Sequence, residues 1–222
     1  MNFTLFSKIS FKVSNPLWLI EAYCFQSDFY SNYDLLSVKT IKDVNERITN
    51  VNKIGARIKI EVLDKCQTVL KTKKKIRLFK YSLDSFMCLN ERKRKDYIRE
   101  FSTDVVIDLL RIKGIGFSKI TKILHTLYPE IIPMIDNPLQ QFYRSQINHK
   151  WSVKEPDKIF IDYYNNFLEE NTRKNLKTVY KQLKTNQVTG LTKLRVFDIL
   201  CWSYLKSKKL KDDYNIKWSS IK

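Results

Sequence analysis

The chain has 222 residues, which is enough for one sizeable domain or for two small lobes that share a cleft. Its hydrophobic content of 43% supplies a buried core and argues against global disorder. Lys and Arg number 41 against 23 Asp and Glu, which gives a net charge of +18. This surplus favours an anionic partner, with nucleic acid as the first candidate, although a lysine-rich composition also fits a charge that serves only solubility.

Cysteine and histidine usage excludes several kinds of site. The four cysteines lie far apart, with no CxxC pair and no Cys/His cluster: Cys24, Cys66, Cys88 and Cys201. This spacing argues against zinc and iron–sulfur sites, so we expect no metal and no cofactor. No apolar run approaches the roughly 20 residues of a membrane span, and the first residues lack a signal-peptide core. We therefore expect a soluble, intracellular protein, in the cytoplasm and nucleoid or in the nucleus.

Glycine and proline are scarce, at four and five residues, which is typical of helices joined by short connections. The first helix is expected to open at Asn15-Pro16, and Ser102 is expected to cap the fifth. Apolar spacing predicts helices over residues 17–25, 41–50, 56–70, 82–89, 103–110, 117–127, 138–147, 156–168, 172–183 and 192–205. The basic runs at residues 71–75, 92–95 and 206–211 are expected to lie between or after helices. The predicted fold class is all-α.

Two of the glycines stand close together, in the segment Ile112-Lys113-Gly114-Ile115-Gly116. A helical pattern runs into this segment, and a second one follows it over residues 117–127. In the second pattern the apolar face holds Phe117, Ile120, Ile123, Leu124 and Leu127, and the polar face holds Ser118, Lys119, Lys122 and His125. The sequence therefore predicts a helix, a tight glycine hairpin and a second helix.

Such a hairpin is suited to binding phosphate. Glycine permits a sharp turn and a close approach of the backbone to a ligand, while the free N–H groups at the start of the next helix attract an anion. Lys113, Lys119 and Lys122 add positive charge around it. A GxG pair also fits a simple helix C-cap. A dinucleotide-binding turn would need a strand in front and a third glycine, and neither is predicted.

A second motif follows one helix later, in Pro133-Met134-Ile135-Asp136. Together with Gly114-Ile115-Gly116 it resembles the helix-hairpin-helix (HhH-GPD) DNA glycosylase superfamily, which includes endonuclease III, the adenine glycosylases and the 8-oxoguanine glycosylases. The shared pattern is a leucine-rich helix, GVG or GIG, a second helix and then Pro-x-x-Asp. The resemblance covers residues 101–144. It implies an all-α, helix-hairpin-helix glycosylase-like fold in which two helical lobes frame a cleft.

The resemblance also implies roles for single residues. Asp136 matches the catalytic aspartate, which helps to activate the nucleophile and stabilises the cationic sugar as the base departs. Ser118 occupies the position in which the bifunctional branches carry a Schiff-base lysine, so a monofunctional enzyme is implied. Lys119 replaces that lysine only if the register is shifted by one residue. Asp136 also fits a plain helix N-cap before Pro138.

Some features depart from the family pattern. Its Leu-Pro before the hairpin is Ile112-Lys113 here, and Asn137-Pro138 follows the aspartate. The cysteine cluster of several branches is absent, so no iron–sulfur cofactor is implied.

The sequence therefore predicts one helical domain over residues 1–222. It comprises an N-terminal lobe at 1–100, the two motifs at 101–144 and C-terminal helices at 145–222. The expected function is base-excision repair by a DNA N-glycosylase that flips a damaged or mispaired base out of double-stranded DNA. Expected DNA contacts are Lys113, Gly114, Ile115, Gly116, Ser118, Lys119 and Lys122.

Two other hypotheses stay open: a helix-hairpin-helix DNA-binding module without catalysis, and a structural helical protein whose charge is incidental. Outside the motifs, most of a set of aromatic residues are expected to pack in the core, although a base-stacking wall among them also stays open: Phe142, Tyr143, Trp151, Phe160, Tyr163, Tyr164 and Phe167. Arg195 and Asp198 are expected to form an ion pair within one helix.

Overall fold

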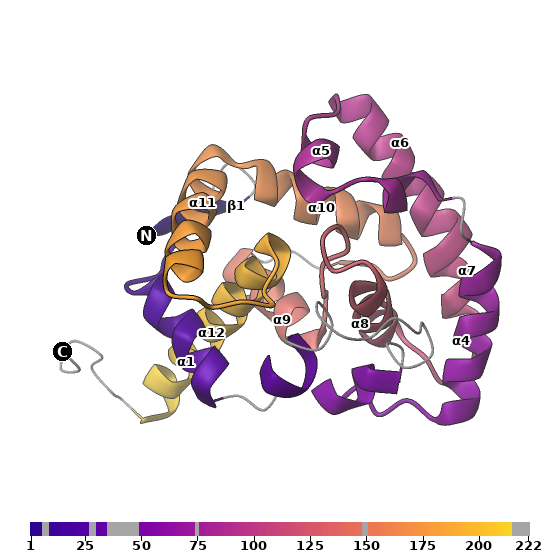
Figure 1. Cartoon of the computed structure of the whole chain (residues 1–222), viewed down its shortest axis with the longest axis horizontal. Coiled ribbons are helices and arrows are strands. Elements are labelled where there is room, and N and C mark those ends of the chain that lie inside the picture. Colours follow the sequence, from indigo (N-terminus) through magenta and orange to yellow (C-terminus); the bar gives the residue numbers. More distant parts are fainter. Residues whose placement is uncertain (6–8, 27–29, 35–48, 74–75, 148–150, 215–222) are drawn as a thin grey trace.

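The computed structural model describes residues 1–5, 9–26, 30–34, 49–73, 76–147 and 151–214. This part of the chain is mostly helical, as predicted. The elements run, in chain order, β1 (Asn2–Leu5), β2 (Ile9–Lys12), α1 (Pro16–Gln26), η1 (Tyr30–Asp34), η2 (Asn50–Ile54), α4 (Ile60–Thr72), η3 (Arg77–Lys80), α5 (Leu83–Met87), α6 (Glu91–Phe101), η4 (Ser102–Val106), α7 (Ile107–Leu110), α8 (Phe117–Leu127), α9 (Asn137–Ile147), α10 (Pro156–Leu168), α11 (Glu170–Thr185) and α12 (Lys193–Tyr214) (Figure 1).

The two ends of the chain pack together. Strand β1 lies against α11, and helix α1 contacts both α11 and α12. Helices α4, α6 and α7 occupy the other side of the molecule, and α8 and α9 lie between the two groups (Figure 1). Helix α10 contacts both α6 and α11 and so joins the two sides. The boundaries predicted at residues 100 and 144 stay predictions.

An antiparallel hairpin of strands β1 and β2 begins the chain and was not predicted. The register pairs Phe3 with Phe11, and their rings stack with centroids 5.3 Å apart. Both rings are buried, and Phe11 also meets the edges of Phe142 and Tyr204. Alternate side chains of a strand point to one face, so each strand directs one aromatic ring into the core. The strands have only four residues each, which is too short for a clear alternating pattern in the sequence.

Several predicted helices and caps are confirmed. The helices expected at 17–25, 82–89, 117–127, 138–147, 156–168, 172–183 and 192–205 correspond to α1, α5, α8, α9, α10, α11 and α12. Asn15 Oδ1 accepts a hydrogen bond from the Trp18 N–H, 3.2 Å away, so it caps α1 as predicted. Helix α12 extends beyond its predicted end and includes the basic run at 206–211.

The helix predicted over residues 56–70 starts later than expected, at Ile60. The preceding loop is held in a non-helical shape because the Asn52 side chain hydrogen-bonds both the N–H and the C=O of Ile58, at 2.7 and 2.9 Å. Arg57 has a φ of 49°, which lies in the left-handed region and cannot continue a helix. The helix predicted at 41–50 falls outside the described residues, apart from its last two positions.

The predicted cap at Ser102 is wrong. Residues 91–110 form one continuous helix in which Ser102–Val106 is a π-helical turn, and the capping residue is Asn90, whose Oδ1 accepts from the Lys93 N–H at 2.9 Å. The basic run at 92–95 therefore lies inside α6 rather than in a loop. Ser102 is buried, and its hydroxyl has no hydrogen-bond partner among the described residues.

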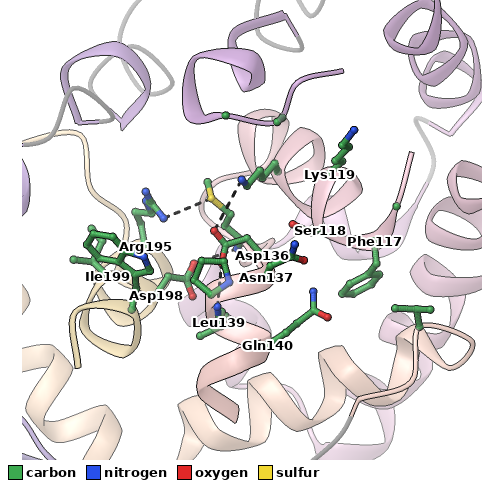
Figure 2. Close-up of a pocket in the computed structure, with 18 of the residues that line it drawn as sticks. Phe117, Ser118, Lys119, Asp136, Asn137, Leu139, Gln140, Arg195, Asp198 and Ile199 are labelled. Carbon is green, nitrogen blue, oxygen red and sulfur yellow. Dashed lines mark hydrogen bonds and ion pairs between the residues drawn. The ribbon is translucent and has the colours of Figure 1, made fainter. Parts of the chain in front are cut away.

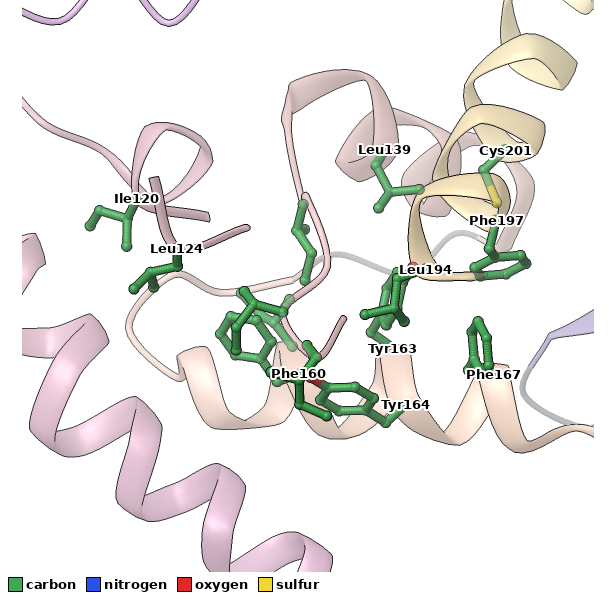
Figure 3. Packing of buried hydrophobic residues seen from close by; sticks show 14 of the residues in the cluster. Ile120, Leu124, Leu139, Phe160, Tyr163, Tyr164, Phe167, Leu194, Phe197 and Cys201 are labelled. Carbon is green, nitrogen blue, oxygen red and sulfur yellow. Dashed lines mark hydrogen bonds between the residues drawn. The ribbon is translucent and has the colours of Figure 1, made fainter. Parts of the chain in front are cut away.

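The core is rich in aromatic side chains from α10. Phe160, Tyr163, Tyr164 and Phe167 are buried, and Figure 3 shows Tyr163 and Phe167 beside Leu194 and Phe197 of α12. Tyr163 and Phe167 each meet the Phe197 ring edge-on, at centroid distances of 5.8 and 5.9 Å. This arrangement confirms that these aromatic residues pack in the core, as the sequence predicts.

We expect Ser102→Ala to stabilise the protein. A buried hydroxyl without a partner costs about 1–3 kcal/mol, and alanine removes that penalty while favouring the helix. The free energy of unfolding from urea titrations should rise by about 1 kcal/mol. The same change at Ser82, whose Oγ accepts from the Ser85 N–H, should lower the free energy instead. Destabilisation by Ser102→Ala would show that the hydroxyl has a partner.

Candidate functional site

The glycine hairpin connects α7 to α8, as predicted. Gly114 has a φ of 96°, a conformation that residues with a side chain rarely adopt. Gly116, at the N-cap of α8, has a φ of −117°, which any residue tolerates. A Cβ built on Gly116 would meet nothing within 4 Å. The turn therefore requires glycine at 114, whereas the chain's own packing does not require it at 116.

The start of α8 offers free backbone donors. The N–H groups of Lys119 and Ile120 both donate to the Gly116 carbonyl, at 3.0 Å. The first N–H groups of a helix, here those of Phe117 and Ser118, have no acceptor within the helix. Because a Cβ at Gly116 would face open space, a ligand can approach these donors closely. The helix dipole adds partial positive charge at the same point.

These donors open onto a pocket of about 520 Å³. Residues of α8, of the segment before α9 and of α12 converge on it (Figure 2). Of the residues predicted from the sequence, the pocket wall contains Gly116, Ser118, Lys119, Lys122 and Asp136. The hairpin and the Pro-x-x-Asp motif thus form one site, although nothing in the sequence between them dictates that contact.

Three predicted contacts lie elsewhere. Gly114 lies in the turn and does not line the pocket, and the side chain of Ile115 is buried in the core. Lys113 lines a separate pocket of about 380 Å³ together with Lys65 and Arg111. Lys113 is thus exposed on the α4 side of the hairpin and does not face Asp136.

Asp136 has a structural role in the pocket wall. Its Oδ1 accepts a hydrogen bond from the Leu139 N–H, 3.1 Å away, so Asp136 caps α9, which is the alternative role that the sequence left open. Its Oδ2 lies 4.0 Å from the Lys122 Nζ. Burial lowers the pKa of Lys122, and the nearby Asp136 carboxylate opposes that change. Capping occupies one oxygen and leaves the other on the Lys122 side.

Lys119 lies on the rim of the pocket. Its Nζ donates to the Arg57 carbonyl, 3.3 Å away, and so connects α8 to the loop before α4. Gly55 and Ala56 of that loop also line the pocket. The loop therefore forms part of the pocket wall.

Sequence reasoning assigned the wrong partner to Arg195. It does not pair with Asp198 as predicted: its Nε donates to Asp34 Oδ1 at 2.9 Å, and its Nη2 donates to the Tyr23 hydroxyl at 2.6 Å. The Tyr23 hydroxyl in turn donates to Asp34 Oδ2 at 2.6 Å. Burial raises the pKa of Tyr23, so its hydroxyl stays neutral. Arg195, Tyr23 and Asp198 all line the pocket.

Asp198 holds the segment that leads to Asp136. Its Oδ2 accepts from the Met134 N–H at 3.1 Å, and its Oδ1 accepts from the Tyr163 hydroxyl at 2.6 Å. Burial raises the pKa of Asp198 to about 7, against the opposing effects of Tyr163 and Arg195. The one-turn spacing of residues 195, 198 and 202 was visible in the sequence, but their partners on distant elements were not.

The sequence predicted His125 on the polar face of α8, and this prediction is wrong. His125 is buried in the core. Its Nδ1 lies 2.6 Å from the Ile132 carbonyl, which can only accept, so Nδ1 carries the proton. Its ring stacks on Tyr33 with centroids 6.1 Å apart. Burial lowers the pKa of His125 to about 3. The neutral imidazole therefore fastens α8 to the chain just before the Pro-x-x-Asp motif.

No protein-family model, curated protein or solved structure shows a significant match to this chain. The resemblance of residues 101–144 to DNA glycosylases therefore stays a prediction. Within the described residues, no helix is long and apolar enough to cross a membrane. In the same part of the chain, no group of three or more His, Cys, Asp or Glu side chains is placed to hold a metal ion.

We expect acid to destabilise the protein through His125. Its folded pKa of about 3 lies below the unfolded value near 6.5, so the folded state binds fewer protons between these values and loses stability as pH falls through them. Between about pH 7.5 and about pH 5, titration of His125 should lower the free energy of unfolding of the wild type by about 2 kcal/mol. His125→Gln keeps a donor for the Ile132 carbonyl and should not show this decrease. Urea unfolding at both pH values measures this difference. Asp198 titrates in both proteins, so its effect cancels, and an equal pH dependence of the two proteins would contradict the assignment.

Proposed function

We propose that the chain binds double-stranded DNA through the helix-hairpin-helix at residues 112–127 and acts as a monofunctional DNA N-glycosylase. The observation that carries this proposal is the single pocket in which the start of α8, with Lys119 and Lys122, meets Asp136. A helix end of this kind can hold a phosphate of the DNA backbone, and a nearby carboxylate can stabilise the sugar cation that forms as a base departs.

The case for DNA rests on charge and on backbone geometry. The chain carries a net charge of +18, so phosphate neutralisation and counterion release favour a polyanion. The first N–H groups of α8 can bind a phosphate that approaches over Gly116, where the chain leaves open space. Contacts of this kind fix the position of the duplex without reading its sequence.

The proposed reaction assigns distinct tasks to the pocket residues. A nucleotide swings out of the stack so that its base enters the pocket, because the reacting bond is inaccessible inside the duplex. As the C1′–N bond breaks and the base leaves with its electron pair, the sugar develops positive charge, which the Asp136 carboxylate stabilises while it orients a water. The water oxygen then bonds to C1′, and the proton that the water loses neutralises the departing base. Ser118 cannot form the Schiff base that a lysine amine forms, so we propose base removal without strand cleavage; a borohydride-trapped adduct at Lys119 or Lys122, which also line the pocket, would contradict it.

A non-catalytic DNA-binding module is the second candidate. The Leu139 hydrogen bond to Asp136 favours it, because capping alone accounts for an aspartate at this position. The two candidates share the hairpin contact and differ only in the use of the second carboxylate oxygen.

A screen of modified duplexes separates the candidates. Duplexes that carry uracil, 8-oxoguanine, alkylated bases or mismatches are incubated with the protein, and alkali then cleaves any abasic site. We expect abasic sites without covalent adducts after borohydride treatment, since Ser118 cannot be trapped. Steeply salt-dependent duplex binding without abasic sites would favour the non-catalytic module. Binding that is insensitive to salt would remove both candidates and leave the charge incidental.

We expect Gly116→Thr to weaken DNA binding while the fold survives. Threonine caps helices about as well as glycine and tolerates the φ of −117°, but its side chain fills the approach to the α8 N–H groups. Affinity for all duplexes should fall about equally, by roughly tenfold or more, in fluorescence anisotropy titrations. Gly114→Ala is the contrasting variant, because its φ of 96° makes it lose stability rather than a contact. Unchanged affinity of folded Gly116→Thr would show that phosphate does not bind there.

We expect Asp136→Asn to abolish base excision and to leave the fold intact. Asparagine caps about as well as aspartate, so the free energy of unfolding should change by less than about 1 kcal/mol. Loss of the negative charge that opposes the sugar cation should slow single-turnover excision on the order of a hundredfold or more. Asp84→Asn is the control: it removes an equal charge outside the pocket and should leave the single-turnover rate of excision unchanged. If Asp136→Asn unfolds early and excises normally per folded molecule, Asp136 is only a cap.

A further inference from the structure

The guanidinium of Arg195 presents to the pocket a donor that the described residues satisfy only weakly. Nε and Nη2 bind the oxygens of Asp34 and Tyr23. Nη1 lies 3.5 Å from the Met134 sulfur, which is a weak acceptor and its sole acceptor within the described chain. The Arg195 side chain is only 12% exposed and lines the pocket (Figure 2). Nη1 is therefore a fixed, largely dry donor that an oxygen of a bound ligand would satisfy.

Asp198 supplies an acceptor beside this donor. It follows Arg195 by three residues on α12, so the two side chains lie on the same face of the helix. Both touch Met134, Asp198 through the backbone N–H and Arg195 through the sulfur. Each Asp198 oxygen accepts one hydrogen bond from the protein, and a carboxylate has about four acceptor positions in all. Capacity for a ligand N–H remains.

The charges on the part of the pocket wall around Arg195 and Asp198 favour a neutral ligand. Asp34 balances Arg195 at 2.9 Å, and Lys122 lies 4.0 Å from Asp136. Burial raises the pKa of Asp198 to about 7, so near neutral pH this side chain adds only negative charge, and an anion would gain little attraction beside Arg195. The remaining wall includes the side chains of Tyr23, Met134, Ile199 and Trp202. Aromatic and apolar surface with a few fixed polar groups suits a flat, uncharged heterocycle.

We propose that Arg195 and Asp198 form a subsite that reads the lactam edge of a nucleobase, with Arg195 Nη1 donating to the ring carbonyl and Asp198 accepting from the adjacent ring N–H. The inference rests on the proposed function for its choice of a nucleobase as the occupant. It narrows the substrate class to bases with a carbonyl next to a ring N–H, such as uracil and hypoxanthine. Adenine and cytosine present an amino group and a bare ring nitrogen at that edge and are disfavoured.

Free bases test the subsite on the intact chain without DNA. Hypoxanthine carries the lactam edge, purine has the same ring system without the carbonyl, and adenine has the amino group instead. In isothermal titrations we expect hypoxanthine to bind on the order of tenfold more tightly than purine or adenine, because a site built for hydrogen bonds rejects an analogue that leaves them unmade. Equal affinities, a preference for purine or adenine, or no binding of hypoxanthine would each overturn the proposal.

Variants of α12 locate the preference. Arg195→Lys keeps a charge for Asp34 but loses the planar fork, and Asp198→Asn replaces an acceptor by a donor. In both variants, the affinity for hypoxanthine should come close to the affinity for purine, so that the ratio of the two approaches one. Lys193→Gln is the matched control on the same helix, because Lys193 pairs with Asp84 outside the pocket, and it should keep the wild-type ratio. Folded Arg195→Lys or Asp198→Asn protein with an unchanged ratio would overturn the assignment. If neither variant folds by circular dichroism, the wild-type ratio decides.

The outcome is separable from that of the duplex screen. A tenfold preference for free hypoxanthine with no excision from any duplex would leave the base subsite standing and remove the glycosylase. Excision of a base from DNA without a preference among the free bases would do the reverse.

Discussion

Arg195 carries a positive charge on a side chain that is only 12% exposed, and a charge so far buried is tolerated only when it is paired and hydrogen-bonded. The partners are Asp34, whose side chain is 2% exposed, and the hydroxyl of Tyr23. These side chains come from α12, η1 and α1, so neutralising one guanidinium brings three separate elements together. Removing one partner from such a buried pair costs about 3–5 kcal/mol, because the other charge is left uncompensated. This pairing places α12 against the N-terminal part of the chain.

From that position, α12 also sets the shape of the pocket. Asp198 holds the Met134 N–H, and two further bonds fasten the same segment to α8: Thr121 Oγ1 donates to the Ile135 carbonyl and His125 Nδ1 to that of Ile132. Asp136 follows directly and begins α9. The hairpin and the carboxylate therefore share one pocket because buried polar groups on α8 and α12 all bind one extended stretch of backbone.

Local signals in the sequence were enough to predict most helices and both motifs. The glycine pair, the proline before Asp136 and the apolar spacing of α8 act within a few residues, where propensity and capping decide. Local signals did not predict the structure correctly where two nearby residues are equally good helix caps and tertiary packing decides between them. Ser102 and Asn90 are both capping residues, and only Asn90 caps, because packing carries the helix through Ser102 as a π-helical turn.

The network around Arg195 was beyond such reasoning. Its spacing to Asp198 fits an ion pair within one helix, yet the chosen partner, Asp34, lies 161 residues away in the chain. His125 has helical spacing that points to the polar face, but it is buried, and its Nδ1 donates to the Ile132 carbonyl. Pairing between residues so far apart in the chain produces no periodic pattern in the sequence. The residues of the pocket on α8 and at Asp136 could therefore be predicted, and those on α12 could not.

The central claim is that this pocket receives a base from duplex DNA. The most direct test places 2-aminopurine in a duplex and follows its fluorescence as the protein binds, because the fluorophore is quenched in the stack and brightens when it leaves it. The account predicts a rise in fluorescence that follows binding measured by anisotropy on the same duplex and disappears at high salt. Full binding with unchanged fluorescence at every position of the probe would contradict it, since the duplex would then be held without any base leaving the helix.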